Sequence, residues 1–271
     1  MSVTGYAPEV EERLRGEAAQ IISRYPQSRS ALLPMLHLVQ SEDGYVSARG
    51  IALCAEILGL TRAEVSAVAT FYTQYKRHPN GDYTLGVCTN ALCAVMGGDI
   101  IFDTLAERLG IGHDETTPDG RITLERVECN AACDYAPVVM VNWEFFDNQT
   151  PTSAVAVADA ILAGERVRPT RGAHEVATFK EISHVLAGFE DGRVDEGGAG
   201  GAPTMRGLEL ARAKQWTAPG REAPAATAAA ASEAGTQPVG DVGSSAEHKD
   251  PRRRPPAVVE STSPEATEGE Q

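Results

Sequence analysis

Four of the five cysteines occur as two close pairs, and their positions constrain the fold more than any other feature of the sequence. Cys88 and Cys93 lie in GVCTNALC, and Cys129 and Cys133 lie in VECNAACDYAP. Each pair follows a segment with the composition of a β-strand. A fold that uses both pairs must bring two strand ends together. Four kinds of site are candidates: a disulfide, a zinc ion, a redox dithiol and an iron–sulfur cluster.

The segments around the cysteine pairs predict a small mixed sheet with helices packed on it. Residues 82–88 and 121–129 are strand-like, and residues 137–148 predict two strands joined by a turn near residues 142–144. Helical spacing of apolar residues appears in two further segments, residues 99–110 and 152–164. The order strand, helix, strand, strand, helix is typical of an α/β layer.

The first 75 residues predict a bundle of four short helices. Apolar residues recur at helical spacing in EVEERLRGEAAQIISRY, and Ser30 and Ser47 are candidate N-caps for the next two helices. Thr61 and Glu64 form a T-x-x-E capping box for the fourth helix. Cys54 lies in an apolar stretch of the third helix, so we expect it to be a small buried residue outside any ligand site.

A further amphipathic helix is predicted after a linker at residues 165–177. Thr178 and Glu181 form its capping box, and apolar residues recur at i, i+3, i+4 and i+7 from Ile182 to Phe189. Because the linker separates this helix from the α/β layer, we expect it to bury its apolar stripe on a partner protein in preference to its own chain.

The segment after residue 190 is predicted to be mostly disordered. Its only aromatic residue is Trp216, and it is rich in glycine, alanine, proline and glutamate. Such a composition buries too little apolar surface to offset the loss of chain entropy. If the tail docks on a partner, the segment expected to do so is MRGLELARAKQW at residues 205–216; otherwise the tail is free.

The sequence therefore predicts four regions: a helical domain at 1–78, an α/β domain at 79–165, a linker with an amphipathic helix at 166–190, and a disordered or partner-docked tail at 191–271.

Charge and hydropathy exclude several classes of function. The formal net charge of −14 disfavours nucleic-acid binding, which needs a basic surface. No apolar run approaches the roughly 20 residues that span a bilayer, and the acidic N-terminus has no signal-peptide core. We therefore expect the protein in a reducing cytoplasm, where a structural disulfide is disfavoured.

The spacing of the cysteines within each pair distinguishes between the remaining kinds of site. A thioredoxin-type dithiol needs C-x-x-C, which neither pair has. Zinc tolerates these spacings, but none of the six histidines lies near either pair in the sequence. A 2Fe–2S cluster needs four thiolates, and small residues let backbone N–H groups approach its sulfides. The alanines and glycines that fill both loops favour the cluster; zinc and unliganded thiols stay open.

Several segments together resemble a known family. GVCTNALC, TLERVECNAACDYAPVVMVN, HLVQSEDGYVS and EVSAVATFYTQYKRHP are similar to the NuoE-type (24 kDa) subunits of NADH–quinone oxidoreductase, respiratory complex I. The resemblance covers about residues 9–165 and includes the C-x4-C-x35-C-x3-C pattern of the thioredoxin-like 2Fe–2S ferredoxins. It implies an N-terminal helical bundle followed by a thioredoxin-like ferredoxin domain.

The resemblance also implies a cofactor and a ligand set. One 2Fe–2S cluster is expected, with Cys88 and Cys93 on one iron and Cys129 and Cys133 on the other. No catalytic residue is expected in this chain, because FMN and NADH belong to the neighbouring F-type subunit. The cluster would exchange single electrons with that FMN. One residue departs from the family pattern: Ala131 stands where many relatives have glycine, which tolerates positive φ better.

The implied setting is a large assembly. The FMN- and NADH-binding F-type subunit and the iron–sulfur G-type subunit are the expected partners, and the chain would be an enzyme only as part of the oxidoreductase. It would lie on the cytoplasmic face of the plasma membrane, attached through the complex alone. Two alternatives remain: an equivalent diaphorase subunit of an NAD-linked hydrogenase or formate dehydrogenase, and an adaptor with a structural four-cysteine zinc site.

Overall fold

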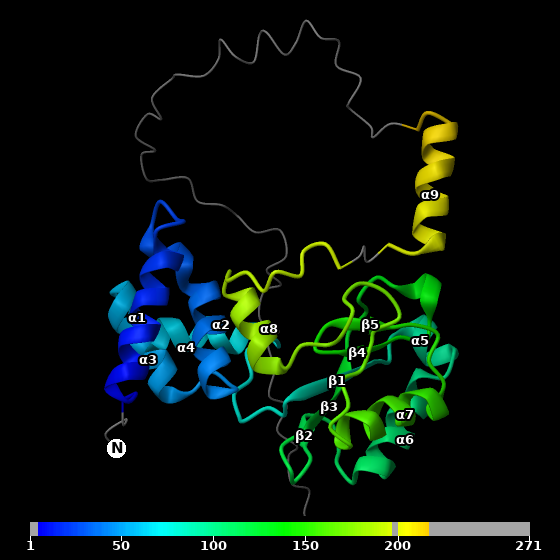
Figure 1. Ribbon diagram of the computed structural model, residues 1–271, viewed down its shortest axis with the longest axis horizontal. Coiled ribbons are helices and arrows are strands. Elements are labelled where there is room, and N and C mark those ends of the chain that lie inside the picture. Colours follow the sequence, from blue (N-terminus) through cyan, green and yellow to red (C-terminus); the bar gives the residue numbers. More distant parts are fainter. Residues whose placement is uncertain (1–4, 197–199, 217–271) are drawn as a thin grey trace, which may run out of the picture. The chain divides into compact units, whose positions relative to one another are not determined.

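The computed structural model describes residues 5–196 and 200–216 (Figure 1). Contacts within the chain divide it into two units, Met1–Gln215 and Trp216–Gln271. Of the second unit, the structure describes Trp216 alone. The part of the expected tail that follows residue 216 therefore lies outside the described residues. The helices, the sheet and the cysteine loops all belong to the first unit.

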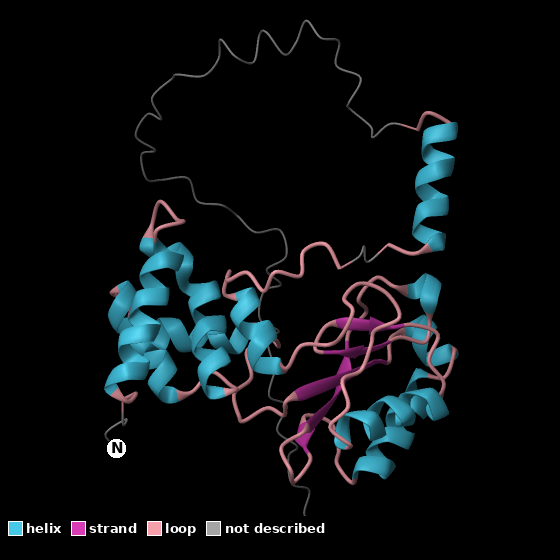
Figure 2. Ribbon diagram, in the orientation of Figure 1, coloured by secondary structure: helices cyan, strands magenta, loops and turns pink. Residues whose placement is uncertain are grey.

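The N-terminal region consists of helices, as the sequence predicts (Figure 2). Two of the expected helix starts are confirmed: Ser47 accepts a hydrogen bond from the Gly50 N–H, and Thr61 and Glu64 form the reciprocal capping box. The Ser30 cap is wrong, because Ser30 lies in a 3-10 turn and the next helix begins without a side-chain cap. The helices are α1 (Pro8–Ile22), α2 (Leu32–Asp43), α3 (Ala48–Leu58) and α4 (Arg62–Phe71).

One apolar core joins these helices. Leu14, Ile21 and Leu36 are among its fully buried residues, and Cys54 is enclosed in the same core. The Cys54 thiol lies 3.7 Å from the Met35 carbonyl oxygen, and burial raises its pKa to about 12. Cys54 is therefore a protonated core residue, as the sequence indicates.

A five-stranded sheet follows, in the order β2-β3-β1-β4-β5. The central strand β1 pairs in parallel with β3 and antiparallel with β4. The turn between β4 and β5 uses Asn142 and Trp143 at positive φ, which fits the predicted hairpin. The strands are β1 (Tyr83–Cys88), β2 (Glu115–Thr116), β3 (Ile122–Val127), β4 (Val139–Val141) and β5 (Glu144–Phe146). The sequence missed β2, since two residues carry no periodic signal.

Helices α6 (Gly98–Leu109) and α7 (Pro151–Leu162) pack against each other and against the sheet. They share an apolar core with Leu85, Val87 and Leu124 of the central strands. Residues that alternate with these in sequence are more polar, and they include Thr84, Thr123 and Glu125. The expected combination of a helical N-terminal region and an α/β layer is confirmed.

Helix α8 (Phe179–Leu186) packs on its own chain, whereas the sequence favoured a partner protein. The predicted stripe is not the part that it buries, because Ile182 and Val185 are half-buried and Leu186 is exposed. The helix lies along α2, with Phe179 and Ser183 buried. The Gln40 amide nitrogen lies 3.4 Å from the Ser183 hydroxyl, and the Phe179 ring lies 5.8 Å from the Trp143 ring. The linker is long enough to return the helix to the N-terminal region, which a sequence pattern cannot show.

The described part of the tail contains one helix, α9 (Ala202–Ala213), where disorder or docking was expected. None of its side chains is buried. Within the residues that the structure describes, no helix combines the length and apolar character needed to cross a bilayer. The domain limits at residues 78, 165 and 190 stay predictions.

Candidate metal centre

The parallel pairing of β1 and β3 brings the two cysteine loops to the same edge of the sheet. Cys88 is the last residue of β1 and stands opposite Val127, the last residue of β3. Cys129 follows two residues later. On the other side of β1, the Cys88 N–H donates to the Val138 carbonyl oxygen at 3.1 Å, just after the second loop. Both loops are therefore attached to the same strand end.

Cys88 and Cys93 form an inner pair that is closed off from solvent. Their exposed fractions are 2% and 3%. Cys93 lies in the short helix α5 (Ala91–Val95), which turns back toward the strand end. Gly98 makes this close packing possible: a Cβ there would lie 2.4 Å from the Cys88 carbonyl oxygen and 2.9 Å from that of Cys93. Position 98 therefore requires glycine, because any side chain there would overlap the backbone of both cysteines.

Cys129 and Cys133 form an outer pair that is exposed. Their Sγ atoms lie 3.5 Å apart, and the Ala131 N–H donates to the Cys129 Sγ at 3.4 Å. Ala131 has φ of +56°, in the left-handed region, so alanine occupies a conformation that favours glycine. Ala132 beside it is buried in the small cluster that also encloses the inner pair.

The thiols influence one another electrostatically. Burial raises the pKa of Cys88 to about 11, and Cys93 and Cys129 contribute to the same rise. The hydrogen bond with Cys129 raises the pKa of Cys133, to which Cys88 also contributes. Thiolate ligands must be deprotonated, so metal binding at this edge releases protons.

The arrangement fits a dinuclear cluster. Zinc in a structural site needs four ligands arranged tetrahedrally at about 2.3 Å for sulfur. The same four thiols match two irons, each with two thiolates, and the Ala131 N–H that donates to the Cys129 Sγ favours such a cluster. Ligation by the four cysteines nevertheless remains a prediction.

Asn90 is a residue of the site that the sequence patterns did not reveal. It lies between Cys88 and Cys93, and its side chain contacts the second loop at Glu128 and Cys129. The only sequence signal is its position after a strand and before a short helix, where asparagine is normally interpreted as an N-cap.

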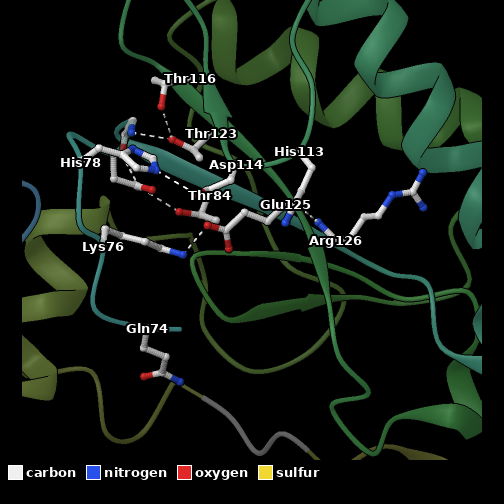
Figure 3. Close-up of polar contacts among 12 residues, drawn as sticks. Gln74, Lys76, His78, Thr84, His113, Asp114, Thr116, Thr123, Glu125 and Arg126 are labelled. Atoms are coloured by element: carbon white, nitrogen blue, oxygen red, sulfur yellow. Dashed lines mark hydrogen bonds and ion pairs between the residues drawn. The ribbon is translucent and has the colours of Figure 1, made fainter. Parts of the chain in front are cut away.

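A groove of about 600 Å³ leads from the second loop across the sheet to the α4–β1 connection. Figure 3 shows its polar contacts. Lys76 and Glu125 form an ion pair that is largely buried, and His78 Nε2 lies 2.9 Å from Asp114 Oδ2. Because these charged side chains pair with each other, they consolidate the junction between the α4–β1 connection and the sheet (Figure 3).

Comparison with known proteins gives matches to most of the chain. The family model for thioredoxin-like [2Fe-2S] ferredoxins matches residues 18–162. The E subunit of NADH-quinone oxidoreductase in Mycobacterium bovis is 60% identical over 215 residues, which cover 79% of this chain and 85% of the relative. NADH-quinone oxidoreductase subunit 2 of Thermus thermophilus is 37% identical over 151 residues, covering 55% of this chain and 83% of the relative.

A solved structure of an NAD+-reducing [NiFe]-hydrogenase also resembles part of the chain. It is 22% identical, covers 49% of this chain and 23% of its own, and has a TM-score of 0.45. A likeness at this level does not discriminate between functions.

Proposed function

The chain belongs to the thioredoxin-like [2Fe-2S] ferredoxin family, and on this premise we propose that it is the electron-transfer subunit, of the NuoE type, in an NADH–quinone oxidoreductase. The observation that carries the proposal is the meeting of two cysteine pairs at one end of β1. The name and extent of the Mycobacterium bovis relative support the same assignment, since the match spans most of both chains.

The residues of this chain hold and surround the cofactor. Cys88, Cys93, Cys129 and Cys133 would supply four thiolates to one 2Fe–2S cluster. When bound, such a cluster accepts and returns one electron at a time. The buried inner pair keeps water from one side, and the Ala131 N–H offsets negative charge on the Cys129 sulfur. Transfer of single electrons needs no general acid or base, so we assign none.

We assign the flavin chemistry to a partner. The F-type subunit would hold FMN and NADH, and the G-type subunit would be a further iron–sulfur neighbour in the complex. The exposed outer pair suits exchange of electrons with such a neighbour. Apolar side chains are also exposed beside the inner pair: Leu92, Val95, Met96 and Ile100. Clustered apolar exposure of this kind favours protein contact.

Membrane attachment would come only through the assembled complex, on the cytoplasmic face of the plasma membrane.

Spectroscopy of the full chain tests the cofactor. Anaerobically purified protein should be coloured, and dithionite reduction should give the EPR signal of one 2Fe–2S cluster. Cys133→Ala should lose or degrade this signal, whereas Cys54→Ala should keep it, because Cys54 lies in the other core. A colourless, EPR-silent protein with one zinc per chain would overturn the redox function and favour the adaptor.

Co-purification tests the assembly. Tagged chain isolated from its own cells should bring the FMN-containing subunit and the quinone-reducing subunits with it. Recovery of hydrogenase or formate dehydrogenase subunits in their place would assign the chain to the alternative machine.

A further inference from the structure

Asn90 connects the two cysteine loops through its side chain. Its Oδ1 accepts a hydrogen bond from the Cys129 N–H at 3.2 Å, and its Nδ2 donates to Glu128 Oε2 at 2.8 Å. Asn90 itself lies between the two cysteines of the inner pair. One half-buried amide thus joins the loop of the inner pair to the first residue of the outer pair.

The side chain of Asn90 does not perform its usual local role. Asn90 occupies the N-cap of α5, with φ of −77° and ψ of 165°, yet it makes no side-chain cap bond. An asparagine at this position normally accepts from an N–H of its own helix. Here the Asn90 Oδ1 accepts from the second loop, so the start of α5 has no side-chain cap.

The second loop has few other attachments near Cys129. Pairing of β3 with β1 ends at Val127, and the next bond to β1 is made by Val138. Between them, the hydrogen bonds that tie residues 128–133 to distant parts of the described chain are the two made by Asn90. The remaining bonds of this segment are local, such as Asn130 Nδ2 to the Glu128 carbonyl oxygen.

We propose that Asn90 is a positioning residue that fixes the outer cysteine pair relative to the inner pair. The inference deepens the proposed function, because it concerns the cluster that the four thiols would hold. The Asn90 oxygen fixes the Cys129 amide and therefore the direction of its thiolate. Without this bond the Cys129 backbone can move away from the inner pair, which loosens the ligand and lets water reach the inner side of the cluster, and greater hydration favours the more negatively charged reduced form.

The test compares three variants of the full chain, each loaded with iron and sulfide anaerobically. Asn90→Ala should lose iron to a chelator about tenfold faster or more, the scale expected when a residue that supports a metal ligand is removed. It should also broaden the EPR signal and raise the reduction potential. Asn90→Asp combined with Glu128→Gln keeps an acceptor for the Cys129 N–H and gives the new carboxylate an amide donor in place of the Glu128 carboxylate. This double variant should retain iron nearly as well as the wild type. Asn130→Ala removes an asparagine from the same site and should change neither property.

The outcomes that would overturn the proposal are distinct from failure of the cofactor assignment. Wild-type iron retention and EPR spectrum in Asn90→Ala would reject the proposal, and so would an equal defect in Asn130→Ala. Loss of iron from the Asn90→Asp, Glu128→Gln double variant as fast as from Asn90→Ala would also reject it. If the wild-type chain binds no cluster, the proposed function fails. The positioning role of Asn90 can then still be tested by amide hydrogen exchange at Cys129 in the iron-free chain. Asn90→Ala must accelerate this exchange and Asn130→Ala must not. Equal exchange rates in the wild type and Asn90→Ala would reject the role.

Discussion

The backbone N–H of Ala131 donates a hydrogen bond to the Sγ of Cys129 at 3.4 Å, while Ala131 itself has φ of +56°. The left-handed φ sets the path of the chain after Ala131, whereas the amide that contacts the thiol belongs to the peptide plane before it. That region costs an L-residue with a Cβ about 1–2 kcal/mol, and glycine is free of this cost. The alanine that distinguishes this loop from the family pattern is therefore strained in place.

Ala131→Gly should relieve this strain. Part of this gain is offset, because glycine has more conformational freedom than alanine in the unfolded chain. We therefore expect a net increase of roughly 0.5–1 kcal/mol in the free energy of unfolding. The EPR signal should persist, because the amide that contacts Cys129 remains. Ala132→Gly is the matched control: Ala132 is buried with φ of −107°, so the same change there should destabilise the chain by about 1 kcal/mol. Urea unfolding measures both, and equal effects would contradict the role of φ.

Gly98→Ala should disrupt the inner cysteine pair. The added Cβ would overlap the carbonyl oxygens of Cys88 and Cys93, which are backbone atoms and cannot rotate away. We expect a loss of about 1–3 kcal/mol or more and reduced iron content. Gly16→Ala in α1 meets no atom within 4 Å and should stabilise its helix by about 0.5–1 kcal/mol. Thermal unfolding and iron analysis of both variants check the prediction; normal iron loading of Gly98→Ala would contradict it.

Phe179→Ala should show that α8 is part of the folded chain. Phe179 is 1% exposed, and its backbone N–H donates to the Asp82 carbonyl oxygen at 2.7 Å. Removal of a buried phenylalanine ring typically costs about 3–5 kcal/mol. Leu186→Ala, at 41% exposure on the same helix, should cost far less. Denaturant midpoints of the isolated chain measure the difference, and similar midpoints would restore the idea that α8 is stabilised by a partner.

Acid should destabilise the helical region through His37. Burial lowers the pKa of His37 to about 4, and its Nδ1 has no hydrogen-bond partner among the described residues. Between pH 6.5 and 4 the unfolded chain binds a proton that the folded chain does not, so stability falls as pH falls through this window. The loss is up to about 3 kcal/mol by linkage and is complete near the folded-state pKa.

His37→Phe separates this effect from the titration of carboxylates. Phenylalanine keeps an aromatic ring beside Tyr75, whose ring centroid lies 4.9 Å from that of His37, and it cannot be protonated. We expect the urea midpoint of the variant to fall less between pH 6.5 and pH 4 than that of the wild type. Parallel pH profiles would show that His37 does not contribute.

Much of the fold followed from short-range patterns in the sequence. The capping boxes at Thr61 and Thr178 lie where they were predicted, because a cap involves residues three positions apart. The central strands were also predicted, since their apolar residues form continuous or alternating runs. β2 was missed, and the start of α2 was misplaced, because neither has such a local signal.

The sequence by itself determined the chemistry available: four thiols in two short loops, with small residues around them, and a fifth thiol inside an apolar helix. Only the tertiary structure decided how they meet. The parallel pairing of β1 with β3 places both pairs at one sheet edge, buries Cys88 and leaves Cys129 exposed. The tertiary structure also packs α8 on α2 and places the Asn90 side chain against the second loop. These contacts join residues far apart in the chain, so their free energies depend on packing that no local window contains.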